Sequence, residues 1–353
     1  MKKSLVALAL MGAFSAAYAQ SSVTIYGTLD AGIIKRTGAT VVEGKRDNNK
    51  LGFKGVEDLG SGLKALFQLE IRYEPDTGTI ESVTRPLFQG QSRVGLQGDF
   101  GTVRLGRGLT AFQESSTAFE PWSGMPNPAG FQTDLMVAGY VSTFGSGSDP
   151  LGPAGNSGNR FSNAVWYNSP VFGGMFQINT TIGTKENNGL ATAIIGHGTA
   201  AAPQYPVGAT GSVPYSISAT ATNGPAAMML AYERNAVDTK FWSIAGSVKP
   251  ISDLKLMASY QQQDQEQSVV INPKTKAWVL GANYTVGVGM IRAGYGQKTP
   301  DNVLNNPNLV KTKQVSLGYD YNLSPRTYLY VEGSNKRQAT TINTFAMGIH
   351  HNF

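Results

Sequence analysis

The chain lacks cysteine and is poor in charge. None of its 353 residues is Cys, and Asp, Glu, Lys and Arg make up 15% of them, against roughly 25% in a typical soluble domain. Without cysteine, disulfides and thiolate metal sites are excluded. Low charge together with 42 glycines and many Tyr, Thr, Ser and Asn residues is typical of β-barrels and β-sandwiches. The net charge of +6 is small and scattered, so we expect no nucleic-acid partner.

Long hydrophobic runs are also missing. After residue 19 no stretch offers the 18 consecutive apolar residues of a membrane-spanning helix. The start of the chain differs, because Lys2 and Lys3 precede a short apolar run (4–14) that Ala17-Tyr18-Ala19 follows. This is the pattern of a secretory signal peptide, and the run is too short for an anchor. We expect residues 1–19 to be cleaved and residues 20–353 to form one exported domain.

Period-two alternation is what the sequence has in abundance. In "LKALFQLEIRYE" (63–74) every second residue from Leu63 to Tyr73 is apolar, and the alternate set is mostly polar. Such alternation predicts a strand with one apolar and one polar face. Similar patterns predict sixteen strands in all, near 22–34, 49–59, 63–74, 91–100, 101–108, 162–170, 173–183, 213–223, 225–234, 240–250, 253–265, 275–286, 288–299, 312–323, 327–336 and 343–353.

The connections between these strands differ in length. Short turns such as 98–101 and Asn223-Gly224 are rich in Gly, Pro, Asn and Asp, whereas 75–90, 109–161, 184–212 and 299–311 are long. Short turns at one end and long loops at the other are typical of bacterial outer-membrane barrels. We therefore predict an all-β fold, a 16-stranded antiparallel transmembrane β-barrel whose apolar faces contact lipid and whose polar faces line a water-filled lumen. The last strand alternates to a terminal Phe353, which we expect to be the signal read by the barrel-assembly machinery.

Four blocks of sequence carry a family resemblance. They are "SSVTIYGTLDAGI" (21–33), "KLGFKGVEDLGSGLKALFQLE" (50–70), "SRVGLQGDFGTVRLGR" (92–107) and "MGIHHNF" (347–353). With them the chain resembles the trimeric general porins of Gram-negative bacteria, in particular the anion-preferring branch, over essentially all of residues 20–353. The resemblance implies a homotrimer in the outer membrane, in contact with lipid and lipopolysaccharide, and a third loop folded into the pore. The tip "FEPWSGMPNP" (119–128) and the His350-His351-Asn352 ending depart from the pattern of this branch.

Basic residues at alternate positions form the first candidate site. By parity Lys54, Arg72, Arg93 and Arg104 point into the lumen from four consecutive strands, and Arg107 precedes the long loop with ambiguous parity. A β-bulge near Gly95 or Gly106 would reverse the facing beyond it. A ring of Arg and Lys is the expected filter of an anion-passing pore, although any barrel lumen is polar. The pore-facing acids Asp30, Glu70 and Asp99 are expected nearby, where they would pair with and position these cations.

The long loop 109–161 is the second candidate site, because loops of this length are usually functional or disordered. It carries Phe112, Phe119, Trp122, Met125 and Phe131, which inward folding against the barrel wall would bury. Its acids Glu114, Glu120 and Asp134 either face the basic ladder across the pore or merely cap turns and pair with trimer neighbours.

The predicted function is passive diffusion of ions and small hydrophilic solutes, with mild anion preference and no cofactor. A solute-specific porin, for instance for organic acids, is an alternative that residue patterns do not distinguish. An outer-membrane hydrolase is disfavoured, because there is no G-x-S-x-G element and the histidines are limited to His197, His350 and His351. His350 and His351 lie on opposite faces by parity, so they do not predict a metal site. Calcium at the acidic loops has no clear ligand spacing to mark it.

Overall fold

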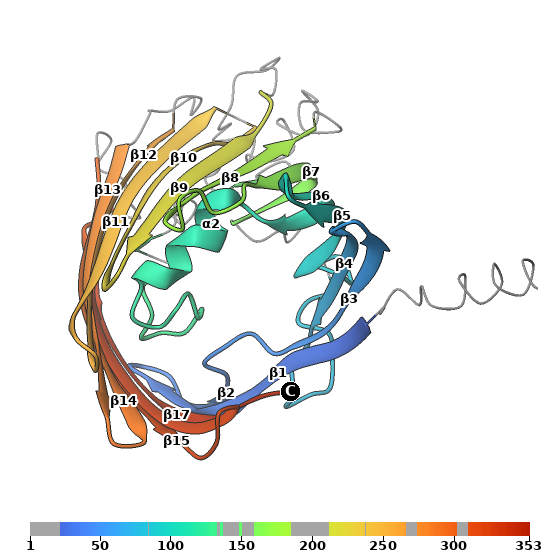
Figure 1. Cartoon of the computed structure of the whole chain (residues 1–353). Coiled ribbons are helices and arrows are strands. Elements are labelled where there is room, and N and C mark those ends of the chain that lie inside the picture. Colours follow the sequence, from blue (N-terminus) through green and yellow to red (C-terminus); the bar gives the residue numbers. More distant parts are fainter. Residues whose placement is uncertain are drawn as a thin grey trace, which may run out of the picture.

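One closed sheet forms the whole of the described structure. The computed structural model describes residues 22–83, 85–132, 135–136, 148–149, 159–184, 212–236, 238–265, 274–301 and 310–353. Its strands form a single antiparallel sheet that curls into a barrel, with one short helix inside the lumen (Figure 1). Within these ranges no helix has the length and apolar character needed to cross a membrane. The predicted signal peptide lies outside the described residues.

The elements follow the predicted order closely. They are β1 (Ser22–Arg36), β2 (Val41–Gly44), β3 (Lys50–Gly60), β4 (Leu63–Arg72), β5 (Gln91–Gly98), β6 (Gly101–Leu109), α2 (Ala111–Ser116), η1 (Thr117–Phe119), β7 (Arg160–Asn168), β8 (Phe176–Gly183), β9 (Tyr215–Asn223), β10 (Ala226–Arg234), β11 (Thr239–Ile251), β12 (Leu254–Gln265), β13 (Lys274–Val286), β14 (Gly289–Pro300), β15 (Thr312–Asn322), β16 (Thr327–Arg337) and β17 (Thr341–Asn352).

The barrel closes where the first strand meets the last. β1 pairs with β17 from Thr28↔Asn352 to Arg36↔Thr344, and with β3 from Ser22↔Val56 to Thr28↔Lys50. At the seam Phe353 and Gly27 exchange backbone hydrogen bonds of 3.1 and 3.2 Å. A side chain on Gly27 would collide with the Phe353 ring, because an added Cβ would lie 2.4 Å from Cζ. The terminal aromatic residue therefore seals the seam of the barrel.

The second crossing of the wall differs from the prediction. β2 was not predicted, and it pairs with β1 from Gly32↔Gly44 to Lys35↔Val41, just beyond the part of β1 that pairs with β3. β2 and β3 are therefore two parts of one crossing, separated by residues 45–49. The sheet has seventeen strands within the described residues, and they make the sixteen crossings that the alternation predicted.

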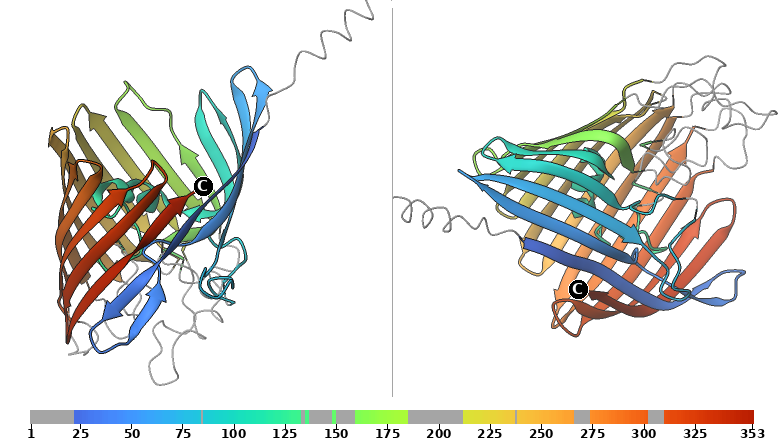
Figure 2. Two further views of the ribbon diagram at one scale, coloured as in Figure 1. Left: turned by 90° about the horizontal axis from the view of Figure 1, so that it is seen from below. Right: turned by 90° about the vertical axis from the view of Figure 1, so that its right-hand side faces the viewer.

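The two faces of the sheet have opposite chemistry. Large apolar side chains such as Ile25, Val94 and Leu317 are exposed on the outside, at 60%, 59% and 61%. Polar side chains on the alternate positions point into the lumen. Strands that tilt across a barrel in this way satisfy their backbone groups with neighbouring strands (Figure 2), and the outer apolar belt then suits contact with hydrocarbon.

Connections at the two ends also follow the predicted asymmetry. Two-residue turns join β3 to β4, β5 to β6, β9 to β10, β11 to β12 and β13 to β14. In one of them Gly224 has φ +54°, a conformation that glycine adopts without the steric cost of a side chain. At the other end lie the long connections between β4 and β5, between β6 and β7, and between β8 and β9.

The neighbours Thr24 and Ile25 test the assignment of faces. Both are exposed on β1, with Ile25 outward and Thr24 on the lumen side. Arginine at Ile25 has to enter lipid, which costs up to about 2–4 kcal/mol at the bilayer midplane and less near its edge. We expect I25R to lower the free energy of unfolding in lipid vesicles, measured by urea titration, and T24R to change it little. Equal losses in both variants would contradict the assignment.

Candidate functional site

Loop 3 (residues 109–161) starts with a capped helical turn inside the barrel. Thr110 caps α2, since its hydroxyl oxygen accepts a hydrogen bond from the backbone N–H of Gln113 at 3.3 Å. The helix then packs its apolar side on the lumen wall. Phe112 meets Phe241 of β11 edge to face at 4.5 Å between ring centroids, and both join a cluster with Phe119 and Met229. The predicted burial of the loop's apolar residues is thus confirmed here.

Glycines in the facing wall make room for the next part of loop 3. A Cβ added to Gly281 would lie 2.3 Å from Pro121, and one added to Gly294 would lie 2.3 Å from Phe131. Trp122 and Phe131, both fully buried, pack with Val279 of β13 in a second cluster. The loop can lie flat on β13–β15 because these wall positions carry no side chain.

Polar side chains of the wall bind the loop backbone. The Gln314 amide donates to the carbonyl of Gly130 at 3.0 Å, Lys255 donates to that of Ala118 at 2.6 Å, and Asn283 donates to that of Pro121 at 3.1 Å. Loop 3 therefore covers the inner face of β9–β16 and leaves the lumen open along β1–β6.

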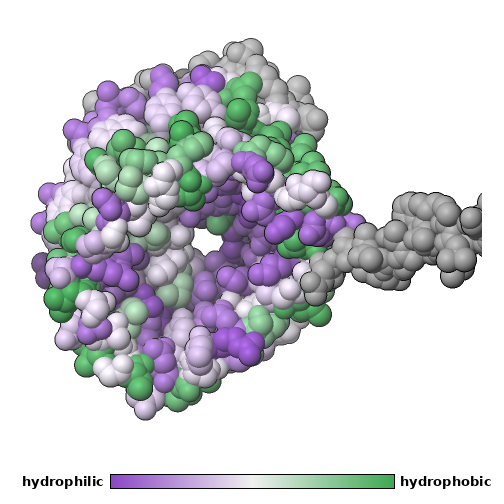
Figure 3. Space-filling view, in the orientation of Figure 1, coloured by the Kyte–Doolittle hydropathy of each residue, from purple (hydrophilic) through white to green (hydrophobic). Residues whose placement is uncertain are grey.

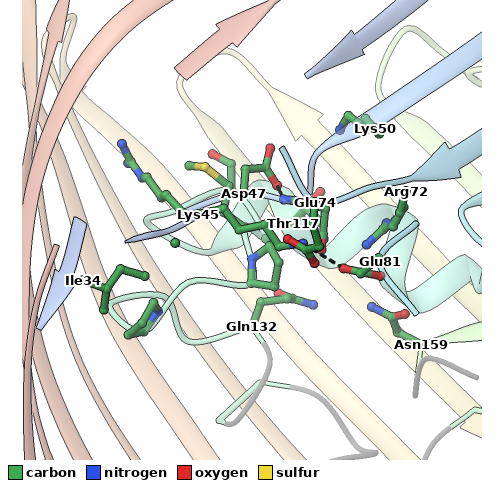
Figure 4. Close-up of a pocket in the computed structure, with 18 of the residues that line it drawn as sticks. Ile34, Lys45, Asp47, Lys50, Arg72, Glu74, Glu81, Thr117, Gln132 and Asn159 are labelled. Atoms are coloured by element: carbon green, nitrogen blue, oxygen red, sulfur yellow. Dashed lines mark hydrogen bonds and ion pairs between the residues drawn. The ribbon is translucent and has the colours of Figure 1, made fainter. Parts of the chain in front are cut away.

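An open passage remains on that side. Viewed in the direction of Figure 1, a hole lined largely by hydrophilic residues runs through the molecule (Figure 3). A cavity of about 860 Å³ lies between loop 3 and the wall of β1–β4. Lys50 and Arg72 project into it from the strands, and Thr117 and Gln132 face them from loop 3 (Figure 4).

The charges that line this cavity are unequal. Seven basic side chains (Arg36, Lys45, Arg46, Lys50, Arg72, Arg85 and Arg160) stand against four acidic ones (Glu43, Asp47, Glu74 and Glu81). Part of this charge is paired, since Lys45 lies 2.6 Å from Glu74 and Arg85 lies 2.7 Å from Glu81. The loop 3 residues on the opposite side, Gln113, Thr117, Ser123, Gly124, Met125, Pro126, Pro128 and Gln132, are all uncharged. One wall is therefore basic and the described part of the other is neutral.

Arg93 and Arg104 of the predicted ladder point inward, but they are not free. The Glu114 carboxylate of α2 lies 2.7 Å from Nη1 of Arg93 and 3.3 Å from Nη2 of Arg104. Gly95 faces Arg104 across β5 and β6, and a Cβ there would lie 2.7 Å from Cγ of Arg104. Glu114 thus contacts the ladder directly, whereas the prediction placed it across the pore.

Lys54 and Arg72 occupy the predicted lumen side. Lys54 is exposed, and its ammonium lies 5.3 Å from the centroid of the Tyr26 ring. In the register of the sheet Lys54 pairs with Gln68 of β4, and Gln68 pairs with Arg93 of β5. Arg72 lies opposite Lys50, and its Nη2 is 3.7 Å from the Glu70 carboxylate. Glu70 is 7% exposed and also accepts a hydrogen bond from the Tyr26 hydroxyl at 3.3 Å. Lys54 is therefore the exposed member of the predicted ladder, and Arg72 is the member that lines the cavity of about 860 Å³.

The expectation that Glu120 faces the pore is wrong. Its side chain is 1% exposed and accepts backbone hydrogen bonds from Gly124 at 2.9 Å and Phe131 at 3.0 Å. Burial raises the pKa of this carboxyl to about 7, although the backbone donors and Arg292 act in the opposite direction. The residue therefore caps turns within loop 3, the alternative that the sequence left open. Asp134 lies outside the described residues.

Three further predicted positions are corrected. Asp30 points inward but is fully buried, because residues 45–49 cover it. Asp99 lies in the two-residue turn between β5 and β6, at the rim of the barrel and away from the ladder. Arg107 follows a register shift at Gly106, which has φ +130°, and bonds the Gln89 carbonyl and the Ser162 hydroxyl. The bulge that the sequence analysis anticipated at Gly106 turns this guanidinium into the wall.

His350 and Asp30 form the pair that the hydrolase alternative would need. Nδ1 of His350 lies 2.9 Å from Oδ2 of Asp30, and the imidazole ring stacks on Tyr328 with centroids 4.5 Å apart. His350 is 3% exposed, so its ring is closed off from any solute in the passage. His351 lies on the outer face next to Thr327.

The residues that sequence reasoning missed are Arg46, Asp320 and Glu332. Arg46 is 1% exposed and pairs with both carboxylates, at 2.5 and 3.2 Å. The signal was present in "KRDNN" (45–49), because a run of Asp and Asn favours a turn over a strand. The carboxylates that contact this segment lie on strands almost 300 positions further along the chain. A local sequence pattern therefore cannot identify them.

Comparison with known proteins identifies the family. The model of Gram-negative porins matches residues 5–341. The chain belongs to the Gram-negative porin family. It is 32% identical to outer membrane porin protein 32 of Delftia acidovorans, over 99% of this chain and 94% of the relative. It is 27% identical to an outer membrane porin protein of Bordetella pertussis over the full length of both chains.

Solved structures agree on the fold of this porin. The anion-selective porin from Comamonas acidovorans superposes with a TM-score of 0.76 at 24% identity, covering 95% of this chain and all of the other. OmpT of Vibrio cholerae in its trimer form gives a TM-score of 0.66 at 14% identity, with 94% and 99% coverage. The chain is therefore an outer-membrane β-barrel porin.

Substituting a wall glycine by alanine tests whether loop 3 packs on this part of the wall. In G294A the new methyl group would meet the buried Phe131 ring, and overpacking of this kind costs about 1–3 kcal/mol. We expect a lower free energy of unfolding and an altered single-channel conductance. The matched control is G246A, where the nearest atom to an added Cβ is 3.7 Å away. Identical behaviour of the two variants would mean that loop 3 does not rest on this wall.

Glu120 makes the porin's stability depend on pH. Its folded-state pKa of about 7 lies above the ordinary value of 4.5, so protonated Glu120 favours the folded state. This contribution is complete below about pH 4.5 and is lost as the pH rises through 7, a change on the order of 3 kcal/mol. We expect the free energy of unfolding to fall between pH 5 and pH 8 in the parent and to vary less in E120Q. An unchanged slope in E120Q would assign the pH dependence to other groups.

Proposed function

We propose that this porin conducts small hydrophilic solutes and ions by passive diffusion with a mild preference for anions. The observation that carries the proposal is the uneven lining of the passage. Apart from Arg46, which is paired with Asp320 and Glu332, six basic and four acidic side chains surround the cavity, and the lining residues between Gln113 and Gln132 opposite them are uncharged. A positive lining inside low-dielectric walls lowers the energy of an anion in the passage and raises that of a cation. The relative from Comamonas acidovorans is itself described as anion-selective.

Loop 3 is proposed as the constriction, and it acts by filling space rather than by adding charge. Its aromatic residues are buried against β10–β15, and the residues between Gln113 and Gln132 that line the cavity are uncharged. Glu114 reduces the basic field locally, because it pairs with Arg93 and Arg104. This pairing accounts for a preference that is mild rather than strong. A solute-specific role remains an alternative that no contact in the described residues favours.

The assembly is proposed to be a homotrimer in outer-membrane lipid and lipopolysaccharide, exported by the signal peptide 1–19. Support comes from the OmpT structure, which is described in a trimer form, and from the broad apolar outer belt. Phe353 at the seam of the barrel supports a role for the last strand in recognition by the barrel-assembly machinery.

Cations with and without an acidic partner on loop 3 should behave differently. In planar bilayers under a potassium chloride gradient, R72S and K54S remove charges that face the passage, and we expect the anion-to-cation permeability ratio to fall on the order of twofold. R93S should have a smaller effect, because Glu114 already offsets that guanidinium. An equal fall in all three variants would contradict the proposed division of the ladder.

Removal of the pairing acid gives the opposite sign. E114Q keeps the size of the side chain but leaves Arg93 and Arg104 without their carboxylate, so we expect a higher anion-to-cation permeability ratio in the same assay. D99N serves as the matched control and should leave the ratio unchanged, because Asp99 is exposed in the turn between β5 and β6, at the rim and away from the ladder. A reduced or unchanged ratio in E114Q would show that the ladder does not set the selectivity.

A further inference from the structure

The second crossing of the wall is interrupted at a place where an unbroken strand would be simpler. Between the partners of Gly44 and Lys50, β1 has three residues (29–31), whereas the opposite side has five (45–49). The surplus is displaced into the lumen, and Asp30 holds it there. The Asp30 carboxylate accepts a hydrogen bond from the backbone N–H of Arg46 at 2.7 Å, and Asn49 bonds both backbone groups of Asp30 at 2.5 and 3.0 Å.

The excursion places the Arg46 side chain against β15 and β16, which lie beyond β17 in the sheet. Nη1 and Nη2 of Arg46 donate to the two carboxylate oxygens of Asp320 at 2.5 and 3.3 Å, and Nε lies 3.2 Å from Oε2 of Glu332. The guanidinium also lies 5.4 and 4.9 Å from the ring centroids of Tyr328 and Tyr330. A planar, forked cation is suited to bridging two carboxylates over aromatic rings.

The same two carboxylates hold loop 3. Glu332 accepts hydrogen bonds from Nε1 of Trp122 at 2.9 Å and from the Asn127 amide at 2.5 Å. Asp320 accepts from Nε of Arg292 at 2.7 Å, and Arg292 in turn donates to the Pro121 carbonyl. Arg46 therefore contacts Glu332, which binds Trp122 and Asn127 of loop 3 directly, and Asp320, which is linked to Pro121 of loop 3 through Arg292.

Charge balance makes Arg46 essential to this arrangement. Asp320 and Glu332 are buried at 3% and 4% exposure, and among the described residues Arg46 and Arg292 are the cations that contact them. Without Arg46 a buried carboxylate would be left uncompensated, which is strongly unfavourable. The carboxylates would then have to bind a proton or turn toward water. Either change weakens the hydrogen bonds that Glu332 accepts from Trp122 and Asn127.

We infer that Arg46 is a positioning residue that locks loop 3 onto the wall of β14–β16, and that residues 45–49 interrupt their strand in order to place it. The inference goes beyond anion passage, because it concerns what fixes the width and steadiness of the passage. The charge of Arg46 is paired with Asp320 and Glu332, so its effect on selectivity is secondary to its effect on the loop.

The test uses the absence of native cysteine. A single cysteine at Ser123, a loop 3 residue that lines the passage, carries a spin label in the full-length porin reconstituted in lipid. In R46M we expect a more mobile label spectrum and larger fluctuations of the open-channel current. R36M is the matched control, because Arg36 lines the same cavity but does not contact Asp320 or Glu332. It should alter the reversal potential without mobilising the label.

R46K separates geometry from charge, and it provides the test if R46M fails to fold. Its ammonium retains the charge but cannot bond both carboxylates with the geometry of a guanidinium, so we expect label mobility between those of the parent and R46M. Parent-like label mobility and current noise in folded R46M or R46K would overturn the inference. Suppose instead that the label stays immobile in R46M and the reversal potential shifts as much as in R36M. Arg46 would then contribute only its charge to the lining and would not position loop 3.

Discussion

The requirement that every backbone N–H and C=O inside a bilayer be hydrogen-bonded determines the rest of this structure. A sheet meets it only when its first and last strands join, as β1 and β17 do from Thr28 to Arg36. Closure with sixteen crossings leaves an interior too wide for wall side chains to fill. That interior is available to loop 3, and the shape of the passage follows from where the loop is held.

Loop 3 divides the lumen into a packed half and an open half. Against β9–β16 the wall supplies apolar side chains and glycines, so that Phe112, Trp122 and Phe131 pack as in a soluble core. Along β1–β6 the wall keeps its cations. Charges that would disturb this division are paired in place. Glu114 offsets one of the two charges of Arg93 and Arg104, whereas Arg46 and Arg292 balance the two charges of the buried Asp320 and Glu332. The remaining field in the passage is that of Lys50, Lys54, Arg72 and their neighbours.

Local sequence pattern was sufficient for the barrel and for much of its lining. Alternation has a period of two residues, so it placed Arg72 and Arg93 on the lumen side without any tertiary information. It missed residues 45–49, where two surplus residues leave the sheet, and it left Arg107 ambiguous, because one extra residue at Gly106 reverses the facing beyond it. It also failed for Glu114 and Glu120. Their partners, an arginine pair on β5 and β6 and two backbone N–H groups within the loop, depend on how loop 3 folds back, which composition does not encode.

The central claim is that the passage is bounded by a basic wall and a neutral loop. The most direct test is the reversal potential of the unmodified porin in a planar bilayer, measured across a tenfold gradient of potassium chloride at low and then at high ionic strength. The account predicts a potential displaced toward the chloride equilibrium value, with the displacement shrinking as salt screens the lining. A potential at zero, or one displaced toward the potassium value, would contradict it.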